Sequence, residues 1–458
     1  MIVHGSFFIL LKSFGSILNV GVSKKMDIKK EHTCSTFLIL ELSRNKSKRR
    51  CVLLNFIITL PGLEGVRVTK SEVKDNGVFE ITVEMPMAPH TCPRCGEETQ
   101  KVHDYRIQSV RHLKMAERPT VLQYRKRRYV CPCGKRFAEQ NPFVDRYQRF
   151  SKEWNQQVQI RTVKAKTFTE IAAQYHTSVS TIIRRFDAIV PDSMKGSAAL
   201  PEVIAIDEFK GNTGKEKFQL IIADAQTREP IDILPNRRKD TIKDYLRKHG
   251  AKVRVVVMDM SLAFKTAVQE ALGRPIIVAD SFHFVRYMNW ALDRVRVREQ
   301  ARWHEYDRKK CKKARYIFHK AAHKLTEKDQ WLLQRYFSFS PELQKAYELK
   351  EAFYTWFYKA KENGGKGILE TQKELRQFYQ KVEGSGIPEL SKTVQTYRNW
   401  EREILNRFEF NYSNGFVEGL NNLTKVMKRN GFGYRNFTRF RARILLHHQY
   451  KNIGHSLG

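Results

Sequence analysis

Three acidic residues stand where a protein sequence can build a metal-dependent site for phosphate transfer. Asp207 and Asp259 each follow an apolar run typical of a buried strand, and Glu418 comes far downstream in the segment Asn-Gly-Phe-Val-Glu-Gly. Carboxylates are preferred ligands of Mg²⁺ and Mn²⁺, and two such ions about 3.5–4 Å apart can hold the attacking and leaving oxygens of a phosphodiester. We therefore expect the three to converge as catalytic metal ligands, although each taken singly would be interpreted as a turn or helix-cap residue.

Carboxylates are scarce in this chain, which is strongly basic overall. The chain has 458 residues, with 83 Lys and Arg against 48 Asp and Glu, and its net charge is +35. A surplus of this size indicates a polyanionic partner. Nucleic acid fits better than a membrane, because no stretch reaches the roughly 18 consecutive apolar residues of a span. One basic run alone is typical of a solvated helix face, but the runs within 101–150 and 294–320 are interleaved with aromatic residues that could stack on bases.

Apolar runs and amphipathic stretches predict the sheet that must position the aspartates. The predicted strands are 203–207, 217–224, 230–234, 253–259 and 275–279, and the predicted helices are 238–249, 262–272 and 281–297. Three strands before the first helix indicate an antiparallel opening section, and the later alternation indicates an α/β sheet. In a ribonuclease-H-like sheet the first and fourth strands are neighbours, which would place Asp207 beside Asp259 at the carboxyl edge.

The predicted helix around Glu418 has a polar face suited to DNA. Asn422, Lys425 and Arg429 follow Glu418 at spacings of four, three and four residues, so the four side chains share one face. This face would offer one carboxylate, one amide and two cations to a metal-bound scissile phosphate.

A third strand-end aspartate, Asp280, has two interpretations. It could cap the helix that follows it, which is the commoner role, or it could be an accessory of the site together with His283. Glu208 adjoins Asp207 but should point to the opposite face of its strand.

Four of the seven cysteines have the spacing of a structural zinc site. Cys92 and Cys95 are separated by two residues, and Cys131 and Cys133 are separated by one. Four thiolates complete a tetrahedral Zn²⁺ shell with no open position for catalysis, and the glycine after each pair permits a tight turn. The alternative is two pairs of buried free cysteines. The odd cysteine count and the paired spacing indicate a reducing compartment.

Residues 151–190 predict helices, including a helix-turn-helix. Thr169 is the expected N-cap of its first helix. The apolar face of its second helix comprises Val179, Ile182, Ile183 and Phe186. The exposed face of that helix would reach base edges and phosphates in a major groove through Ser180, Thr181, Arg184 and Arg185. Two packed helices without DNA are the alternative.

Changes in composition divide the chain into segments. Strands are predicted at 52–60 and 78–84, with short strands at 121–124 and 129–130 between the cysteine pairs. The predicted segments are an uncertain extension (1–51), a zinc ribbon (52–145), a helix-turn-helix (146–195), a first catalytic part (196–298), a basic helical insertion (299–399) and C-terminal catalytic helices (400–458). Met26 opens a hydrophilic stretch and could be the true first residue.

Together and in this order, the motifs resemble those of bacterial insertion-sequence transposases of the DDE superfamily, in the family with an N-terminal zinc ribbon called ISL-three (ISL3). The matching segments are the ribbon ending in Cys-Gly-Lys-Arg-Phe, Ile-Asp-Glu at 206–208, Val-Met-Asp-Met-Ser at 257–261, Ala-Asp-Ser-Phe-His at 279–283 and Asn-Gly-Phe-Val-Glu-Gly at 414–419. The resemblance covers roughly residues 52–450. It implies a ribonuclease-H-like catalytic fold with Asp207, Asp259 and Glu418 as its triad, Mg²⁺ dependence, and cutting and joining of DNA at terminal inverted repeats.

The first hypothesis is therefore a metal-dependent DNA transposase of multidomain α/β fold, in which a mixed sheet with a helical insertion follows the ribbon and the helix-turn-helix. It would bind terminal inverted repeats and target DNA as a homodimer or higher oligomer, in the bacterial cytoplasm and on the nucleoid, without a membrane. The second hypothesis is a non-catalytic, sequence-specific DNA-binding regulator derived from a transposase. The helix-turn-helix argues against a third, a nuclease of RNA–DNA hybrids, because hybrids are recognised by shape rather than by base readout.

Overall fold

The computed structural model describes residues 63–164, 167–190, 194, 199–213 and 215–453. The chain divides into a unit of residues 1–55 and a unit of residues 56–458, and every described residue belongs to the second unit. The predicted extension at 1–51 and the predicted strand at 52–60 therefore lie outside the described residues. Across the described ranges, no helix combines the length and the apolar composition that crossing a bilayer requires.

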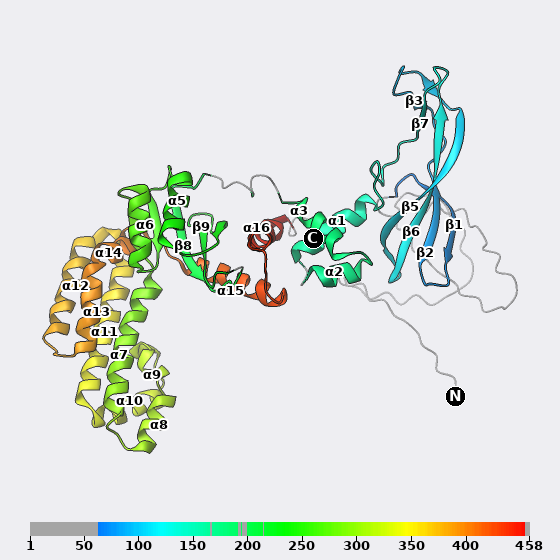
Figure 1. Cartoon of the computed structure of the whole chain (residues 1–458). Helices are drawn as coiled ribbons and strands as arrows, with labels where there is room; N and C mark the ends of the chain where they lie inside the picture. The colour runs from blue at the N-terminus through cyan, green and yellow to red at the C-terminus, as the bar shows by residue number, and fades with distance from the viewer. Residues whose placement is uncertain (1–62, 165–166, 191–193, 195–198, 214, 454–458) are drawn as a thin grey trace, which may run out of the picture. The chain divides into compact units, whose positions relative to one another are not determined.

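The cysteine-rich region is built on one long β-hairpin (Figure 1). Its two strands are β5 (Val102–Met115) and β6 (Arg118–Val130), which pair antiparallel around a two-residue turn. Both turn residues, Ala116 and Glu117, have positive φ, as the tightest hairpin turns require. The other strands of this region are β1 (Arg67–Val73), β2 (Phe79–Glu84), β3 (His90–Thr91), β4 (Glu98–Thr99) and β7 (Arg136–Ala138).

The segments 121–124 and 129–130 are extended, as predicted, but the expectation of short strands is wrong, because both belong to one strand, β6. Four consecutive basic residues lie between the two segments. One of these four, Arg127, is buried, and its guanidinium pairs with the buried carboxylate of Glu139 at 3.3 Å. A buried and paired arginine lets the strand continue where its sequence looks exposed.

Three helices follow the hairpin: α1 (Lys152–Lys164), α2 (Phe168–Gln174) and α3 (Val179–Asp187). The second and third form the predicted helix-turn-helix. The expectation that Thr169 caps α2 is wrong, since the N-cap is Thr167, whose hydroxyl accepts a hydrogen bond from the Glu170 N–H at 3.0 Å. The helix starts earlier because Phe168 packs against Phe186 of α3, with 5.3 Å between ring centroids.

The central sheet has the strand order β10-β9-β8-β11-β12, as the sequence predicted for a mixed sheet with an antiparallel opening section. Its outer three strands on one side are antiparallel, whereas β8, β11 and β12 run parallel. The strands are β8 (Val203–Phe209), β9 (Gln219–Asp224), β10 (Pro230–Leu234), β11 (Val255–Met258) and β12 (Ile276–Ala279). The helices that connect and follow them are α5 (Lys239–His249), α6 (Leu262–Leu272) and α7 (Ser281–Gln300).

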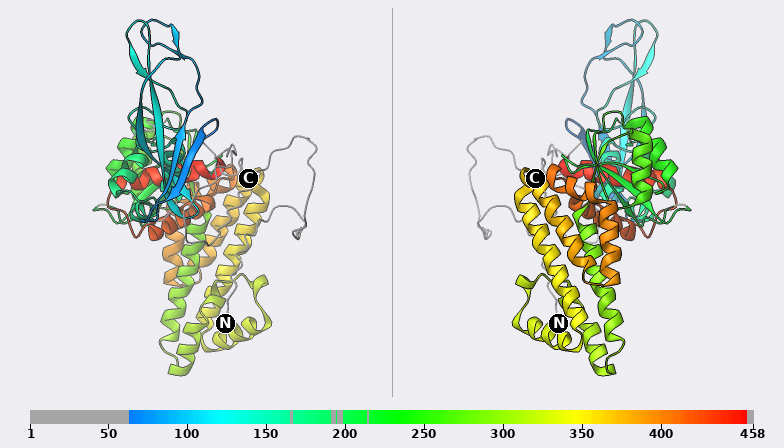
Figure 2. Two further views of the ribbon diagram at one scale, coloured as in Figure 1. Left: turned by 90° about the vertical axis from the view of Figure 1, so that its right-hand side faces the viewer. Right: turned by 90° about the vertical axis from the view of Figure 1, so that its left-hand side faces the viewer.

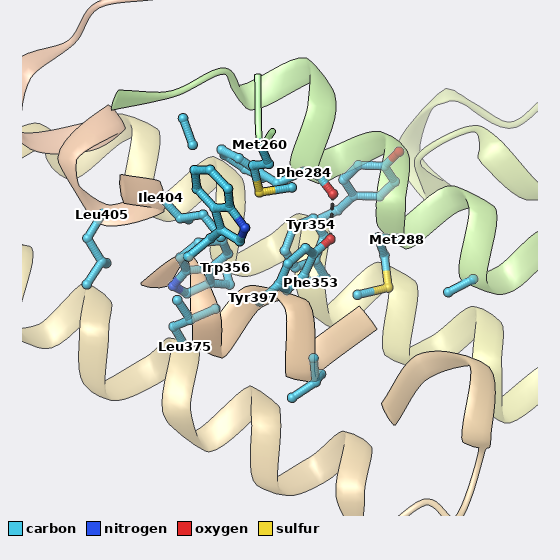
Figure 3. Packing of buried hydrophobic residues seen from close by; sticks show 14 of the residues in the cluster. Met260, Phe284, Met288, Phe353, Tyr354, Trp356, Leu375, Tyr397, Ile404 and Leu405 are labelled. Atoms are coloured by element: carbon cyan, nitrogen blue, oxygen red, sulfur yellow. Dashed lines mark hydrogen bonds between the residues drawn. The ribbon is translucent and has the colours of Figure 1, made fainter. Parts of the chain in front are cut away.

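The helical insertion shares its hydrophobic core with one face of this sheet. A single buried cluster contains Ile204 and Val256 of the sheet together with Phe353 and Tyr397 of the insertion. Figure 2 shows the long insertion helices running alongside α7, and Figure 3 shows the hydroxyl of Tyr397 donating a hydrogen bond to the carbonyl oxygen of Phe284. The insertion helices are α8 (Glu305–Lys313), α9 (Tyr316–His319), α10 (Glu327–Phe339), α11 (Pro341–Asn363), α12 (Ile368–Glu383) and α13 (Pro388–Asn399), with short 3₁₀ turns at Ala322–Lys324 and Gly364–Gly367. Helix α14 (Glu401–Phe410) follows the insertion.

The other face of the sheet is covered by α15 (Gly415–Asn430) and α16 (Phe437–Ile453). Side chains alternate along β8, so that Ile204 and Ile206 face the insertion while Val203 and Ala205 face these two helices. Helix α16 also contacts the helix-turn-helix, where Arg439 pairs with Asp187 at 2.8 Å. The sheet is therefore buried on both faces, as its near-continuous apolar strands predicted.

We expect Phe353→Ala to destabilise the sheet and the insertion together, because Phe353 is 1% exposed in their shared core. Removing a buried phenylalanine costs about 3–5 kcal/mol, which in a domain of this size lowers the unfolding midpoint by roughly 10 °C. Differential scanning calorimetry would measure the shift. Trp331→Ala is the matched control, because Trp331 is 62% exposed and its loss should leave the midpoint nearly unchanged. A separate transition for the insertion alone would contradict a shared core.

Candidate active site and zinc site

The parallel register of three strands places three aspartates at one level. Ala205 of β8 lies opposite Val257 of β11, so Asp207, two residues further along, comes level with Asp259. Strand β12 pairs with β11 in the same direction, and Asp280, the residue after β12, also comes level with Asp259. Carboxyl ends of parallel strands meet at one edge of a sheet, which is the usual location of sites in α/β folds.

The alternation of side chains points all three aspartates toward the α15 face. Ala205, Val257 and Val278 belong to the cluster packed against α15 and α16. Each aspartate comes two residues after one of them, and side chains two apart in a strand share a face. Glu208 points the other way, as the sequence predicted, and pairs with Arg237.

Asp259 and Asp280 meet His283 of α7 in a compact group. One ligand atom from each of the three lies within 4.8 Å of the other two. Within the described ranges, the only other group of this kind is the four cysteines, so neither Asp207 nor Glu418 belongs to one. Asp280 occupies the N-cap position of α7, but its side chain accepts no hydrogen bond from the helix. Of its two interpretations, the one that places it beside the site with His283 fits the geometry.

The ring of His283 is held between a carboxylate and a guanidinium. Its Nε2 lies 2.9 Å from Asp259 Oδ2, and its Nδ1 lies 2.6 Å from Arg286 Nη2. A guanidinium can only donate, so Nδ1 is the acceptor and the ring proton sits on Nε2, which donates to Asp259. The second carboxylate oxygen, Asp259 Oδ1, is buried and has no hydrogen-bond partner among the described residues. Asp259 is thus fixed through one oxygen and leaves the other for a ligand.

Two buried asparagines fasten α15 to the aspartate strands. Asn421 Nδ2 donates to Asp207 Oδ2 at 2.7 Å. Asn414, just before the helix, donates through Nδ2 to the Ile206 carbonyl at 3.1 Å and through its backbone N–H to Asp280 Oδ1 at 3.3 Å. The start of α15 is therefore bound to β8 and to the residue after β12.

Glu418 lies in the first turn of α15, three residues before Asn421, so the two side chains are neighbours on the helix. Its side chain is exposed, and no described residue forms an ion pair or a hydrogen bond with its carboxylate. Asn422, Lys425 and Arg429 are also exposed, which gives the polar face that the spacing predicted. Glu418 is thus brought to the edge that carries Asp207, on a turn open to solvent.

Burial makes ionisation unfavourable for two of the aspartates, Asp207 and Asp280. Burial raises the pKa of Asp207 to about 7, and the negative charge of Asp259 adds to the rise. Burial also raises the pKa of Asp280, against the opposing effect of the Asn414 backbone N–H and of His283. Carboxyl groups with raised pKa values that lie together at a sheet edge are typical of functional sites.

The four predicted cysteine ligands come together in the ribbon. Cys92 Sγ lies 3.7 Å from Cys133 Sγ, and Cys95 Sγ lies 3.4 Å from Cys131 Sγ, with all four atoms within 4.8 Å. Tetrahedral Zn²⁺ with bonds of about 2.3 Å separates its sulfur ligands by about 3.8 Å, so the donor set fits zinc. The shorter second spacing in the sequence therefore does not prevent convergence.

The expected exposed face of α3 is confirmed for Ser180 and Arg184 but wrong for Thr181. Thr181 is 9% exposed, and its side chain lies 3.0 Å from the hydroxyl of the capping residue, Ser178. Arg185 is only partly exposed, because its guanidinium lies over the ring of Phe150. A helical face predicted from spacing alone does not account for these packing and capping contacts.

Sequence reasoning did not identify the asparagines or Arg286 as parts of the site. Asparagine is unfavourable inside a helix, so Asn421 one turn after Glu418 was a signal for a polar contact. Arg286 follows His283 by three residues, which places the two on one helix face. No comparable signal marks Asn414, whose contacts depend on the tertiary fold.

Three family models match the chain in the order of its structural regions. Residues 204–444 match the model of a DDE-type family named ISL3 and described as transposase. Residues 88–133 match a model described as the zinc-finger of transposase IS204/IS1001/IS1096/IS1165, and residues 139–190 match the helix-turn-helix domain of transposase family ISL3.

Two curated proteins are similar to parts of the chain. One is the transposase for insertion sequence element IS1001 of Bordetella parapertussis, which is 28% identical over 369 residues, covering 77% of this chain and 87% of that protein. The other is a protein of Lactococcus lactis subsp. lactis named ATP-dependent protease, which is 32% identical over 140 residues. That match covers 30% of this chain and 40% of the relative.

Cys95→Ala should abolish zinc binding, because a tetrahedral site that loses one of four thiolates loses most of its affinity. Purified wild-type protein should contain one zinc per chain by elemental mass spectrometry. Cys311→Ala is the matched control, since Cys311 is buried in α8 and belongs to no group of metal ligands among the described residues. Equal zinc in both variants would contradict the assignment.

Asp207→Asn should stabilise the metal-free protein at pH 8. The folded-state pKa of Asp207, about 7, lies above the unfolded value, so the contribution of this group is fully present below about pH 4 and is lost as pH rises through about 7. At about 1.4 kcal/mol per pKa unit, the loss is about 4 kcal/mol. Chelator-treated wild type should lose this stability between pH 4 and 8 in denaturant titrations.

The Asp207→Asn variant should lack that loss, because its amide does not ionise. Glu208→Gln is the control, since Glu208 is the neighbouring acid on the opposite strand face, and it should keep the pH dependence of the wild type. If the free energy of unfolding depends on pH in the same way for wild type and Asp207→Asn, the pKa of Asp207 is not raised in the folded protein.

Proposed function

The chain belongs to the ISL3 family of transposases, and from this premise we propose that Asp207, Asp259 and Glu418 form its DNA-cleaving and strand-transferring site. The observation that carries the proposal is the arrangement at the sheet edge. Two aspartates stand level on neighbouring parallel strands, and the helix that bears Glu418 is bound to the first of them through Asn421 at 2.7 Å. This arrangement supports a site built from three acids that are far apart in the sequence.

Divalent cations fit this edge. Asp259 Oδ1 is buried without a hydrogen-bond partner in the described part of the chain. The pKa of Asp207 is raised by burial and, to a smaller extent, by the charge of Asp259, and a bound cation would offset both effects. Asp207, Asp259 and Glu418 would hold two Mg²⁺ or Mn²⁺ ions, with Asp280 as an accessory. Bound Mg²⁺ would supply Lewis-acid activation of a water or a 3′-hydroxyl and would neutralise charge on the leaving oxygen.

The other residues of the site position these ligands. The Nε2 proton of His283 holds Asp259 Oδ2, and hydrogen bonding of ligand carboxylates is a common way to orient them. Asn421 orients Asp207 in the same way from α15. Along the exposed face of that helix, Asn422, Lys425 and Arg429 would contact the phosphates on either side of the scissile bond.

Recognition of DNA ends would come from the regions before the catalytic sheet. The exposed side chains of Ser180 and Arg184 on α3 would reach base edges in the major groove, and the basic hairpin of the zinc ribbon would hold the adjacent backbone. The DNA bound would be the terminal inverted repeats of the element. Cutting two ends together would require a homodimer or higher oligomer, working on the bacterial nucleoid.

Asp207→Asn, Asp259→Asn and Glu418→Gln should each keep DNA binding and lose cleavage by at least about 10³-fold, because each removes one charge from the metal site. The substrate is a plasmid that carries the gene together with the DNA flanking it on both sides, where the proposal places the inverted repeats. Nicks and released ends are measured by gel with Mg²⁺ or Mn²⁺. Glu208→Gln is the matched control and should cleave like the wild type within a few-fold.

Two outcomes would contradict the proposal. Wild-type protein that binds the repeats but never cuts them with either metal would favour the non-catalytic regulator. Full activity of Glu418→Gln would remove Glu418 from the proposed ligand set while leaving the two aspartates in place.

A further inference from the structure

A stripe of exposed aromatic rings begins beside the carboxylates and runs along α7. Phe282 and Trp290 are 56% and 45% exposed. Arg286 lies between them in sequence at spacings of four, so the three share one face of the helix. The guanidinium carbon of Arg286 lies 5.4 Å from the ring centroid of Phe282 and 4.7 Å from that of Trp290. These three side chains are called the α7 stripe below.

The α7 stripe is joined to the acidic edge by direct contacts. Arg286 donates to His283 Nδ1, and His283 in turn donates to Asp259 Oδ2. The rings of Phe282 and His283 meet edge to face at 5.8 Å between centroids. Whatever occupies the stripe therefore lies within a few side chains of the residues proposed to cut DNA.

The α7 stripe has features of an incomplete binding surface rather than of core packing. Two large rings stay about half exposed although the helix buries its other face, including Phe284 and Met288. Arg286 Nε is buried without a hydrogen-bond partner among the described residues. An unsatisfied buried donor costs roughly 1–3 kcal/mol, and such groups concentrate where a ligand completes the site.

We propose that the α7 stripe binds an unpaired DNA base next to the phosphodiester that reacts. This inference rests on the proposed function and adds the conformation of its substrate. Aromatic faces and arginine planes are the groups on which proteins stack unpaired bases, and a guanidinium between two rings supplies both. The strand end beside the cut would lie open rather than paired.

The charge of the chain favours DNA over a second protein copy as the occupant. Each chain carries a net charge of +35, which attracts a nucleic acid strand and opposes close contact between two copies unless DNA neutralises their charge. Base stacking is also compatible with the partial exposure of the two rings. A stacked base covers one face of a ring and leaves its own edge in contact with water.

Single-strand binding by the full zinc-loaded protein tests the proposal. The probes are a fluorescein-labelled oligothymidylate of about 20 nucleotides and a mixed-sequence duplex of the same length, in about 0.3 M NaCl to weaken phosphate contacts. Fluorescence anisotropy gives both affinities. Phe282→Ala and Trp290→Ala should each weaken single-strand binding about ten-fold and change duplex binding less than two-fold, because only unpaired bases can stack on the rings.

Trp331→Ala is the matched control. Trp331 is 62% exposed on α10, and Arg335 lies over its ring at 6.0 Å, so it repeats the chemistry of the α7 stripe at another place. This variant should bind both probes like the wild type. Any of three results would overturn the proposal. Trp331→Ala could weaken single-strand binding as much as the stripe variants do, the stripe variants could weaken duplex binding equally, or both stripe variants could bind single strands like the wild type.

Photocrosslinking gives a second measurement that no folding defect can imitate. An oligonucleotide carrying 5-iodouracil should crosslink the wild-type protein at Phe282 or Trp290, as located by mass spectrometry of the peptides. Crosslinks that map only elsewhere would overturn the proposal. If the stripe binds single strands but the wild type never cuts repeats, the proposed function fails and the stripe stands; if the wild type cuts repeats and the stripe variants bind normally, only the stripe fails.

Discussion

The arrangement of the site depends on the register of three parallel strands. With Ala205 opposite Val257 and with β12 in parallel beside β11, the chain must place Asp207, Asp259 and Asp280 at one level and on one face. Like charges this close repel, and burial adds to the cost. Parallel pairing, with both sheet faces covered by apolar layers, supplies the rigidity that keeps them together. A register shift of one residue would turn an aspartate to the opposite face and dismantle the group.

The same edge explains why α15 lies where it does. Helix α14 is anchored to the sheet by Asn406, whose Nδ2 donates to the Ile277 carbonyl at 2.8 Å. The chain then reverses at Asn411, which adopts a left-handed conformation with φ of 53°. After this reversal, Asn414 and Asn421 bind the start of α15 to the aspartate strands. The core of the insertion thus determines where the chain returns to the sheet. The side chains of Asn414 and Asn421 then set the position of Glu418, more than a hundred residues after the chain left the sheet.

The sequence predicted the parts of this arrangement that depend on local pattern. Strand periodicity located all five strands of the central sheet, and cysteine spacing identified a ligand set that converges. Errors arose where tertiary contacts override local preference: Thr167 rather than Thr169 caps α2, and β6 continues through basic residues because Arg127 is buried against Glu139. The hydrogen-bond partners of the carboxylates could not be predicted from the sequence for the same reason. A hydrogen bond such as that of Asn421 to Asp207 joins residues 214 positions apart, and periodicity carries no information over that distance.

Helix α7 connects the insertion to the acidic edge through direct contacts at both ends. Its first turn carries His283, which holds Asp259, and its later turns are buried in the core that the insertion shares with the sheet. The hydroxyl of Tyr397, deep in the insertion, donates to the carbonyl of Phe284, the residue directly after His283. A packed core transmits displacement because its side chains leave few voids to absorb it. A ligand that contacts the exposed face of α7 would therefore affect the orientation of Asp259 through this one helix. The insertion thus supports the geometry of the site and is not a separate domain.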